Sequence, residues 1–345
     1  MTGNAPRPLV AMALLLFFTG WSSPLASARL AAQQSPLPTV VLSRIGSIAG
    51  PADLVQASGT RLMVAGGRTL TLFDLGDPAM PKRMGAFTFA DTVSAFKVVG
   101  TRVYAAIDLA GLAILDVSAP SAPRLLGTFK TPGQAHGVAV SGSTVLVADH
   151  MSGVDIIDIS NPERPVSTGA FFLEGYARDV AVSGTTAYAV DSPNSFYVLD
   201  LTKPGTFEPV ATLTAANGRF IDVSRAEDDS GASGAGRAIV ACVPGPSGLQ
   251  VFDVSNPKTP VLAATFRTSG RPQRVSVSGA RAFVADGAEG VQVVDIARPS
   301  VPALVGGFKT TGPARDVAVA GSLVFVVSGP DTVLILQASS PSQVR

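Results

Sequence analysis

Three features of the sequence predict an all-β fold: a recurring 42-residue unit, four short apolar runs in each unit, and turn residues between those runs. The runs are rich in valine and isoleucine, too short for helices, and bounded by glycine, proline, serine or asparagine. Four antiparallel strands in a unit of about this size are typical of a propeller blade. We therefore expect a seven-bladed β-propeller, with an open β-solenoid as the alternative.

An aspartate at the end of an apolar run, often in a D-x-S-N-P turn, marks each copy of the repeat. These residues are Asp74, Asp116, Asp158, Asp200, Asp253 and Asp295. Their intervals are 42, 42, 42, 53 and 42 residues, and one further step of 42 reaches Gln337 in a degenerate seventh copy. The long interval contains EDDSGASGAGR, from Glu227 to Arg237, whose composition is typical of a flexible surface loop.

The third copy gives the order of strands expected in every unit. Its predicted strands are Leu125–Thr131, His136–Ser141, Thr144–Asp149 and Val154–Ile159. Val40–Ile48 resembles the first of these, whereas the sequence near Leu336 resembles the last. We expect the N-terminal strand to complete the last blade, closing a propeller over residues 39–338 and removing open sheet edges.

The first 28 residues have the pattern of a secretory signal peptide. Arg7 precedes an apolar run from Leu9 to Phe18, and a small-residue motif ends at Ala28, with the alanines at 31 and 32 as a second cleavage option. The run is too short to span a bilayer, and a retained membrane anchor is the alternative. We expect a linker over 29–38, a C-terminal tail over 339–345, no membrane span after signal removal, and a secreted or periplasmic location.

Composition narrows the possible partners. Loss of Arg7 with the signal leaves the chain formally neutral, and a neutral chain lacks the basic surface that nucleic-acid binding requires. The single cysteine, Cys242, cannot form an internal disulfide, which favours the periplasm over a harsher exterior. We expect a monomer without a cofactor.

The repeat cores GVDIIDISNPERP, AHGVAVSGSTVLVAD and GVQVVDIARPSVP resemble the LVIVD repeat of exported bacterial and archaeal proteins. The resemblance runs from about Val40 to Pro341. It implies a propeller, often at the cell surface, with no activity common to all members. After Leu336 only QASSPSQVR follows, without the apolar tail or sorting signal of anchored members, which favours a free secreted or periplasmic protein.

The repeated aspartates are expected to make turns, because a carboxylate there accepts backbone N–H groups two or three residues on. A metal or ligand belt formed by these aspartates is the alternative.

Function is expected where the copies differ, at the starts of the second strands and the ends of the third, which meet on one face at the mouth of a central channel. The candidate ligand-binding residues are Asp53, His136, Asp149, His150, Arg178, Asp179, Gln273, Arg274, Asp286, Arg315 and Asp316. Ser94-Ala95, Asp191 and the segment Phe220 to Asp222 occupy equivalent places. Apolar residues such as valine and alanine are expected farther along the strands.

Two chemical interpretations stay open at this face. His136 and His150 with Asp149 have the donor types for a metal or a general base, or else they are solvated, hydrogen-bonded side chains. Arg178 and Arg315 are either ion-paired around the channel or recognise an anion.

The sequence contains none of the short motifs of zinc proteases, serine hydrolases or nucleotide-binding loops, so we assign no catalytic residue and no metal site. The favoured function is a non-catalytic scaffold that binds a protein, peptide or glycan through the polar face. The alternative is a hydrolase or lyase acting on lactones or glycans, with His136, Arg178 and Arg315 as its polarising groups.

Overall fold

The computed structural model describes residues 39–192, 195–202, 208–214, 218–226, 237–244 and 248–339. All of them belong to one compact unit, Pro38–Arg345. The predicted signal peptide and linker, residues 340–345 of the predicted tail and residues 227–236 of the insertion lie outside the described residues. Within the described part of the chain, no helix is long and apolar enough to cross a membrane.

The described residues form 28 β-strands, and β1 (Val40–Ala49) precedes a repeating series. The strands that open each series are β2 (Leu54–Ser58), β6 (Ala95–Val99), β10 (Gly137–Ser141), β14 (Tyr176–Ser183), β18 (Gly218–Ala226), β22 (Arg274–Ser278) and β26 (Ala314–Ala320). The second strands are β3 (Arg61–Gly66), β7 (Arg102–Ala106), β11 (Thr144–Ala148), β15 (Thr186–Ser192), β19 (Arg237–Pro244), β23 (Arg281–Ala285) and β27 (Leu323–Ser328).

The third strands are β4 (Thr69–Asp74), β8 (Leu112–Asp116), β12 (Val154–Asp158), β16 (Ser195–Asp200), β20 (Leu249–Asp253), β24 (Val291–Asp295) and β28 (Thr332–Ser339). The fourth strands are β5 (Lys82–Thr88), β9 (Arg124–Phe129), β13 (Val166–Phe171), β17 (Ala211–Thr214), β21 (Val261–Phe266) and β25 (Ala303–Phe308). The four strands predicted in the third copy appear as β9 to β12, each within two residues of its expected ends. The all-β prediction is therefore confirmed.

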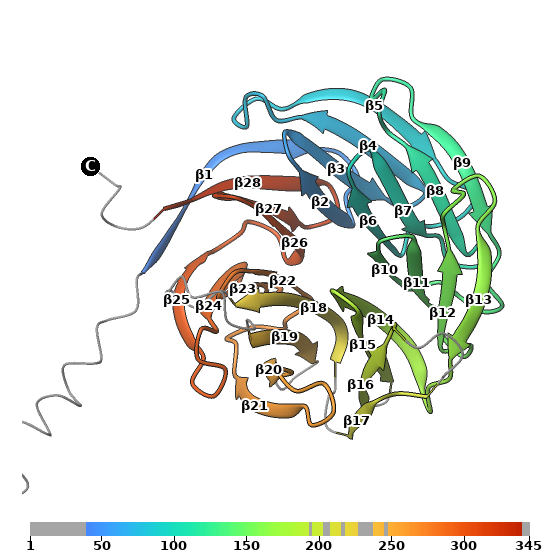
Figure 1. The fold of residues 1–345 in the computed structure, drawn as a ribbon. Helices are drawn as coiled ribbons and strands as arrows, with labels where there is room; N and C mark the ends of the chain where they lie inside the picture. The colour runs from blue at the N-terminus through green and yellow to red at the C-terminus, as the bar shows by residue number, and fades with distance from the viewer. Residues whose placement is uncertain are drawn as a thin grey trace, which may run out of the picture. The chain divides into compact units, whose positions relative to one another are not determined.

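The strands pair into antiparallel meanders. Five sheets have four strands each, in the order in which the strands follow one another along the chain. Figure 1 shows these sheets arranged around a common centre in a propeller-like fashion, with the opening strand of each series innermost. As predicted, the Leu125–Thr131 strand, β9, is the outer strand of the preceding sheet, β6 to β9.

The sixth sheet has eight strands and contains β1. Strand β1 pairs antiparallel with β28, from Val41 opposite Ser339 to Ala49 opposite Thr332. A short parallel contact with β25, at Val40 opposite Gly306, links this set to β22–β25. The strand from the beginning of the described chain thus stands in the place of a fourth strand beside β26, β27 and β28.

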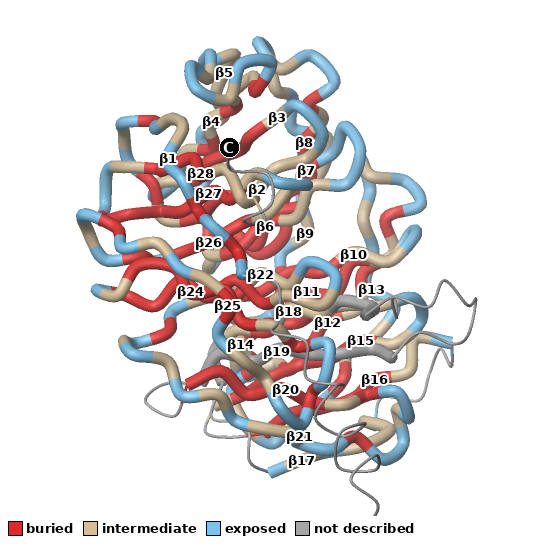
Figure 2. Tube along the Cα trace, turned by 90° about the vertical axis from the view of Figure 1, so that its left-hand side faces the viewer, coloured by how far each residue is buried: buried red, intermediate tan, exposed pale blue. Residues whose placement is uncertain are grey.

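The hydrophobic core lies between neighbouring sheets. One cluster joins Leu146 and Val154 of the β10–β13 sheet to Val180, Ala189 and Leu199 of the β14–β17 sheet, and similar clusters follow between other pairs of sheets. Figure 2 shows the buried stretches along the inner strands and the exposed ones at turns. Each sheet is stabilised mainly by packing against the two sheets beside it. This packing fixes the positions of the inner strand ends.

The repeated aspartates make the predicted turns. The Asp158 carboxylate accepts the backbone N–H of Ser160 at 2.9 Å and its hydroxyl at 2.5 Å, and Asp116 accepts the N–H of Ser118 at 2.8 Å. These hydrogen bonds hold the pKa of both carboxyl groups below the ordinary value. The local role expected for this motif is confirmed.

Candidate functional site

The opening strands of the series surround a central cavity of about 190 Å³. Its lining contains charged and amide side chains from six of these strands: Gln56, Lys97, Asp179, Asp222, Arg274 and Asp316. Of these, Asp179, Arg274 and Asp316 belong to the predicted site. Gln56 and Lys97 lie farther along their strands, where apolar residues were expected, so that expectation was wrong at these positions.

Two buried carboxylates at the start of β14 and β26 bind the neighbouring sheet. Asp316 accepts the N–H of Val317 at 2.9 Å through Oδ1 and the N–H of Val55, in the next sheet, at 2.8 Å through Oδ2. Asp179 repeats this arrangement with Val180 at 2.9 Å and Ile221 at 3.1 Å. Each carboxylate therefore links two neighbouring sheets through hydrogen bonds.

A second layer of the same contacts lies two residues deeper in the cavity. Asp222 accepts the N–H of Val223 at 3.0 Å and that of Val277, in the next sheet, at 2.8 Å. The Gln56 side-chain oxygen accepts the N–H of Val98 at 3.1 Å. The open edges of these inner strands are thus satisfied by side chains of the preceding sheet, as buried N–H groups require.

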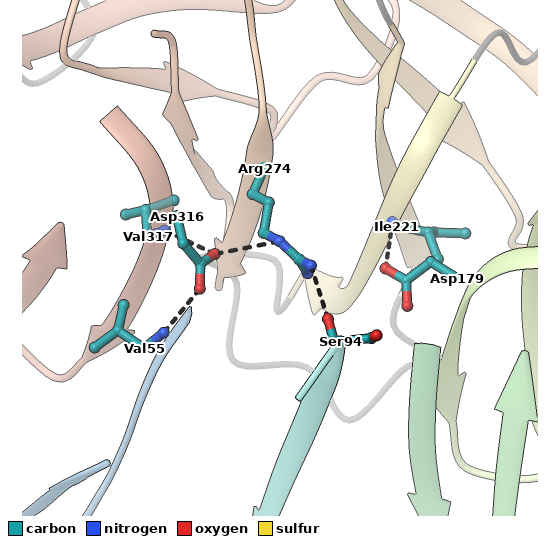
Figure 3. Close-up of polar contacts among 7 residues, drawn as sticks. All are labelled: Val55, Ser94, Asp179, Ile221, Arg274, Asp316 and Val317. Atoms are coloured by element: carbon teal, nitrogen blue, oxygen red, sulfur yellow. Dashed lines mark hydrogen bonds and ion pairs between the residues drawn. The ribbon is translucent and has the colours of Figure 1, made fainter. Parts of the chain in front are cut away.

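Arg274 lines the cavity, and Figure 3 shows its side chain between Asp316 and Asp179. Its Nε lies 3.8 Å from Asp316 Oδ1, and its terminal nitrogen donates to the carbonyl of Ser94, on the far side of the ring of strands, at 3.3 Å. The guanidinium carbon stands 3.9 Å from the centre of the Phe220 ring, a cation–π contact. Arg274 therefore ties three opening strands together.

Burial raises the pKa of the Asp179 and Asp316 carboxyl groups, and the charges of Arg274 and Lys97 oppose that rise. Because both carboxylates accept two backbone N–H groups and face cations, their charge is compensated within the protein. This arrangement assigns the predicted site residues Asp179, Arg274 and Asp316 a role in holding sheets together.

Asp179, Arg274 and Asp316 hold equivalent positions in their opening strands. We call the residues that directly precede this position in six of the strands the rim: Asp53, Ser94, His136, Arg178, Gln273 and Arg315. Arg315 pairs with Asp53 at 3.0 Å, in line with the ion-paired interpretation, although its partner is not the adjacent Asp316. Asp53 also accepts the N–H of Gly67 at 2.9 Å. Gln273 is exposed and donates to the carbonyl of Arg271 at 3.1 Å.

Asp149 and Asp286 are fully buried beneath the loops that lead to the rim. Asp149 Oδ2 accepts the N–H of Gly133 at 2.6 Å, and Asp286 Oδ2 accepts that of Gly270 at 2.8 Å. Asp191 binds Gly175 in the same way at 2.9 Å. These carboxylates were expected at the channel mouth; in the structure they are buried, and each accepts a backbone N–H of a loop.

The anchoring carboxylates have a side-chain partner six residues on, in the third strand of the sheet. Tyr197 donates to Asp191 at 2.7 Å, and Gln292 donates to Asp286 at 2.8 Å. In the β10–β13 sheet this donor position is held by Asp155, which is 4% exposed and adjoins Asp149. Burial and the Asp149 carboxylate raise the pKa of Asp155 to about 7. Asp155 therefore keeps its proton up to about neutral pH.

Three aromatic side chains meet at His136, a residue of the rim. The His136 and His150 rings make an edge contact with centroids 5.3 Å apart, and His150 stacks on Tyr176 at 4.5 Å with a 4° interplanar angle. Burial, Arg178 and His150 lower the pKa of His136, against Asp108 and Asp149, which raise it. We call His136, His150, Tyr176 and Arg178 the rim cluster.

The rim cluster brings together the two histidines and Arg178, as the sequence predicted, and adds Tyr176. Within the described residues, no group of three or more His, Cys, Asp or Glu side chains is placed to hold a metal ion. The sequence analysis missed Tyr176 and Asp155. Tyr176 could have been found from its position two residues before Arg178, and Asp155 from being a carboxylate inside an apolar strand. Whether the rim binds a ligand stays a prediction at this point.

The fold is shared with many proteins of known structure, since 1563 chains in solved structures match it. A chain in the crystal structure of a mitotic checkpoint complex matches with a TM-score of 0.69 over 86% of this chain and 94% of that chain, at 11% identity. So low an identity shows a common fold alone. No curated protein matches the sequence.

The model of the LVIVD repeat matches the sequence five times, at residues 92–131, 132–171, 174–207, 241–268 and 269–310. Four of the matches include the opening strand of their series, whereas the match at 241–268 begins within β19. All five include the third strand, which ends at the repeated aspartate. Together the matched stretches make up more than half of the sequence, and the chain therefore belongs to the LVIVD-repeat family.

Proposed function

We propose that the chain is an exported, closed seven-bladed propeller that serves as a non-catalytic binding module. Three features support the architecture: five four-stranded sheets, an eight-stranded sheet that divides at the β25–β1 contact into two sets of four, and a cavity lined by the opening strands. In this arrangement β1 provides the outer strand of the seventh blade. The signal-like first 28 residues support export.

The observation that carries the binding role is the contrast between the cavity and the rim cluster. The cavity carboxylates and Arg274 are engaged with backbone groups and with one another, so their charges serve the fold. In the rim cluster, the Tyr176 side chain is 46% exposed and stacks on His150 beside Arg178. A rigid ring of sheets holding such side chains at its face suits recognition of an outside molecule.

The mature protein, immobilised and probed with glycan and peptide arrays, tests this role. We expect at least one class of probe to bind, and the double variant His136→Ala with Arg178→Ala to lose it at an unchanged unfolding temperature. Arg164→Ala is the matched control, because Arg164 is exposed in the aspartate turn at the opposite end of the same sheet. Equal binding by the double variant and the control would place the function elsewhere.

One observation favours a hydrolase or lyase instead. The lowered pKa of His136 leaves its imidazole neutral near pH 7, the form that a general base requires. Turnover of lactones or glycans by the purified protein, abolished by His136→Ala, would replace the binding role with this activity.

A further inference from the structure

We infer that the rim cluster is a binding site for the carboxylate of an acidic polysaccharide, with Arg178 as its cation and the His150–Tyr176 stack as a flat wall. This inference rests on the proposed binding role and names the ligand class. It begins with the position of Arg178. The pairing of β14 with β15 shifts register between Ala177 and Asp179, so Arg178 is the extra residue of a β-bulge. Bulges turn a side chain away from the regular alternation, and they are common beside binding sites.

Arg178 differs from two other arginines near the cavity mouth. Arg315 is also the extra residue of a bulge, between Ala314 and Asp316, but it pairs with Asp53 at 3.0 Å. Arg274 is held by Asp316 and Phe220. The Nε of Arg178 is buried and has no hydrogen-bond partner among the described residues. A buried donor without a partner costs about 1–3 kcal/mol, so an incoming acceptor that reorients this guanidinium gains that free energy.

The imidazole of the neighbouring His136 can donate a second hydrogen bond to the carboxylate of the ligand. Burial and the Arg178 charge keep His136 neutral near pH 7, so its ring can donate one N–H to a carboxylate without being protonated. The charged groups that act on His136 are Arg178, Asp108 and Asp149, with His150 beside them. The fully buried Asp149 carboxylate accepts the N–H of Gly133, and in the described part of the chain it forms no ion pair with Arg178.

His150 is held in a backbone conformation that side chains rarely adopt. Its φ is +52°, and the equivalent loop of the β22–β25 sheet uses Gly287 with φ +60°. Both residues make the same isolated bridge, to Ala177 and Ala314 respectively. Asp108, with φ +37°, makes the same bridge, to Ala135, so two of these three loops carry a side chain at the strained position. At His150 the strain supports a role for the imidazole because its ring stacks on Tyr176.

The wall and the cation together specify the ligand. A guanidinium binds a carboxylate through parallel hydrogen bonds, whereas an exposed ring pair offers a flat apolar surface. The cluster lies on an open face, with Met151 and Phe172 each 73% exposed in the adjacent loops. The exposed ring of Tyr176 can pack against the apolar face of a sugar ring in an extended chain, and a uronic acid adds the carboxylate.

Calorimetric titration with three polymers tests the inference: polygalacturonate, neutral dextran, and polyglutamate as a peptide of like charge. We expect polygalacturonate to bind, and the other two to bind at least tenfold more weakly. Arg178→Gln should weaken polygalacturonate binding about ten- to a hundredfold, since a charge-assisted hydrogen bond is lost. Arg178→Lys should recover little of it, because the ammonium lacks the planar fork. Arg164→Gln is the control and should stay within twofold.

Three outcomes would overturn the inference. Unchanged polygalacturonate binding by Arg178→Gln removes Arg178 from the site. Equal binding of polyglutamate shows that charge alone is recognised and excludes the saccharide. Absence of polygalacturonate binding excludes the ligand class, while the glycan and peptide arrays decide separately whether the rim binds anything.

Discussion

The buried pair of Asp149 and Asp155 predicts that one substitution will stabilise the protein at neutral and alkaline pH. In Asp155→Asn the side-chain amide donates to Asp149 without needing a proton, as Gln292 does toward Asp286 at 2.8 Å. In the unchanged protein the donor must be a protonated carboxyl, because carboxylates only accept hydrogen bonds. The amide therefore removes the loss of stability that ionisation of Asp155 causes as pH rises.

The magnitude follows from the two pKa values of Asp155. Its ordinary value is 3.8 and the folded protein raises it to about 7. Between these values the folded protein keeps a proton that the unfolded chain releases, so the free energy of unfolding falls as pH rises, and the loss is complete above about pH 7. At 1.36 kcal/mol per pH unit the total loss is about 4 kcal/mol.

Urea unfolding at pH 4, 6 and 8 measures this effect. The stability difference between Asp155→Asn and the unchanged protein is expected to grow from near zero at pH 4 to about 4 kcal/mol at pH 8. Other buried carboxyls, such as Asp286, titrate in both proteins and cancel in the difference. Gln292→Glu is the converse test, because it puts a carboxyl against Asp286 and should lose stability as pH rises. Parallel pH curves for Asp155→Asn and the unchanged protein would refute the raised pKa of Asp155.

Three further predictions concern the sheets and the rim. Asp316→Ala leaves the N–H groups of Val55 and Val317 without an acceptor and should cost about 3 kcal/mol in urea unfolding; Asp316→Asn, which keeps one acceptor, should cost less, and equal costs would argue against the contact. His150→Gly should leave stability within about 1 kcal/mol, since glycine fits φ +52°, while polygalacturonate binding weakens; unaltered binding would exclude the ring. Deletion of residues 40–49 should expose the edge of β28 and produce aggregates on size-exclusion chromatography; a monomeric product would contradict the role given to β1.

The repeat, the strands and the aspartate turns could be predicted from sequence because each depends on contacts within a few residues. Asp158 binds Ser160, two positions away, so the motif contains its own partner. The strand ends were within two residues of their expected positions in the third copy for the same reason.

The roles of the cavity residues could not be predicted, because their partners are backbone groups of another sheet. Asp179 binds the N–H of Ile221, which the sequence letter at 221 does not reveal. Gln56 and Lys97 were missed since alternation along an inner strand predicts apolar neighbours, whereas the centre of the ring is polar. Arg178 and Arg315 look alike in sequence, and only the structure shows which one has a carboxylate partner.

Strands β1 and β28 pair with each other although nearly the whole length of the described chain lies between them. A chain that emerges from a ribosome or an export channel in order makes the first of these strands long before the last. Until β28 arrives, β1 has no antiparallel partner, and contacts of such long range form slowly. The sheet that contains β1 and β28 is thus the last sheet of the described chain to be completed. A prematurely terminated chain would carry an unpaired edge, which marks it for aggregation or proteolysis.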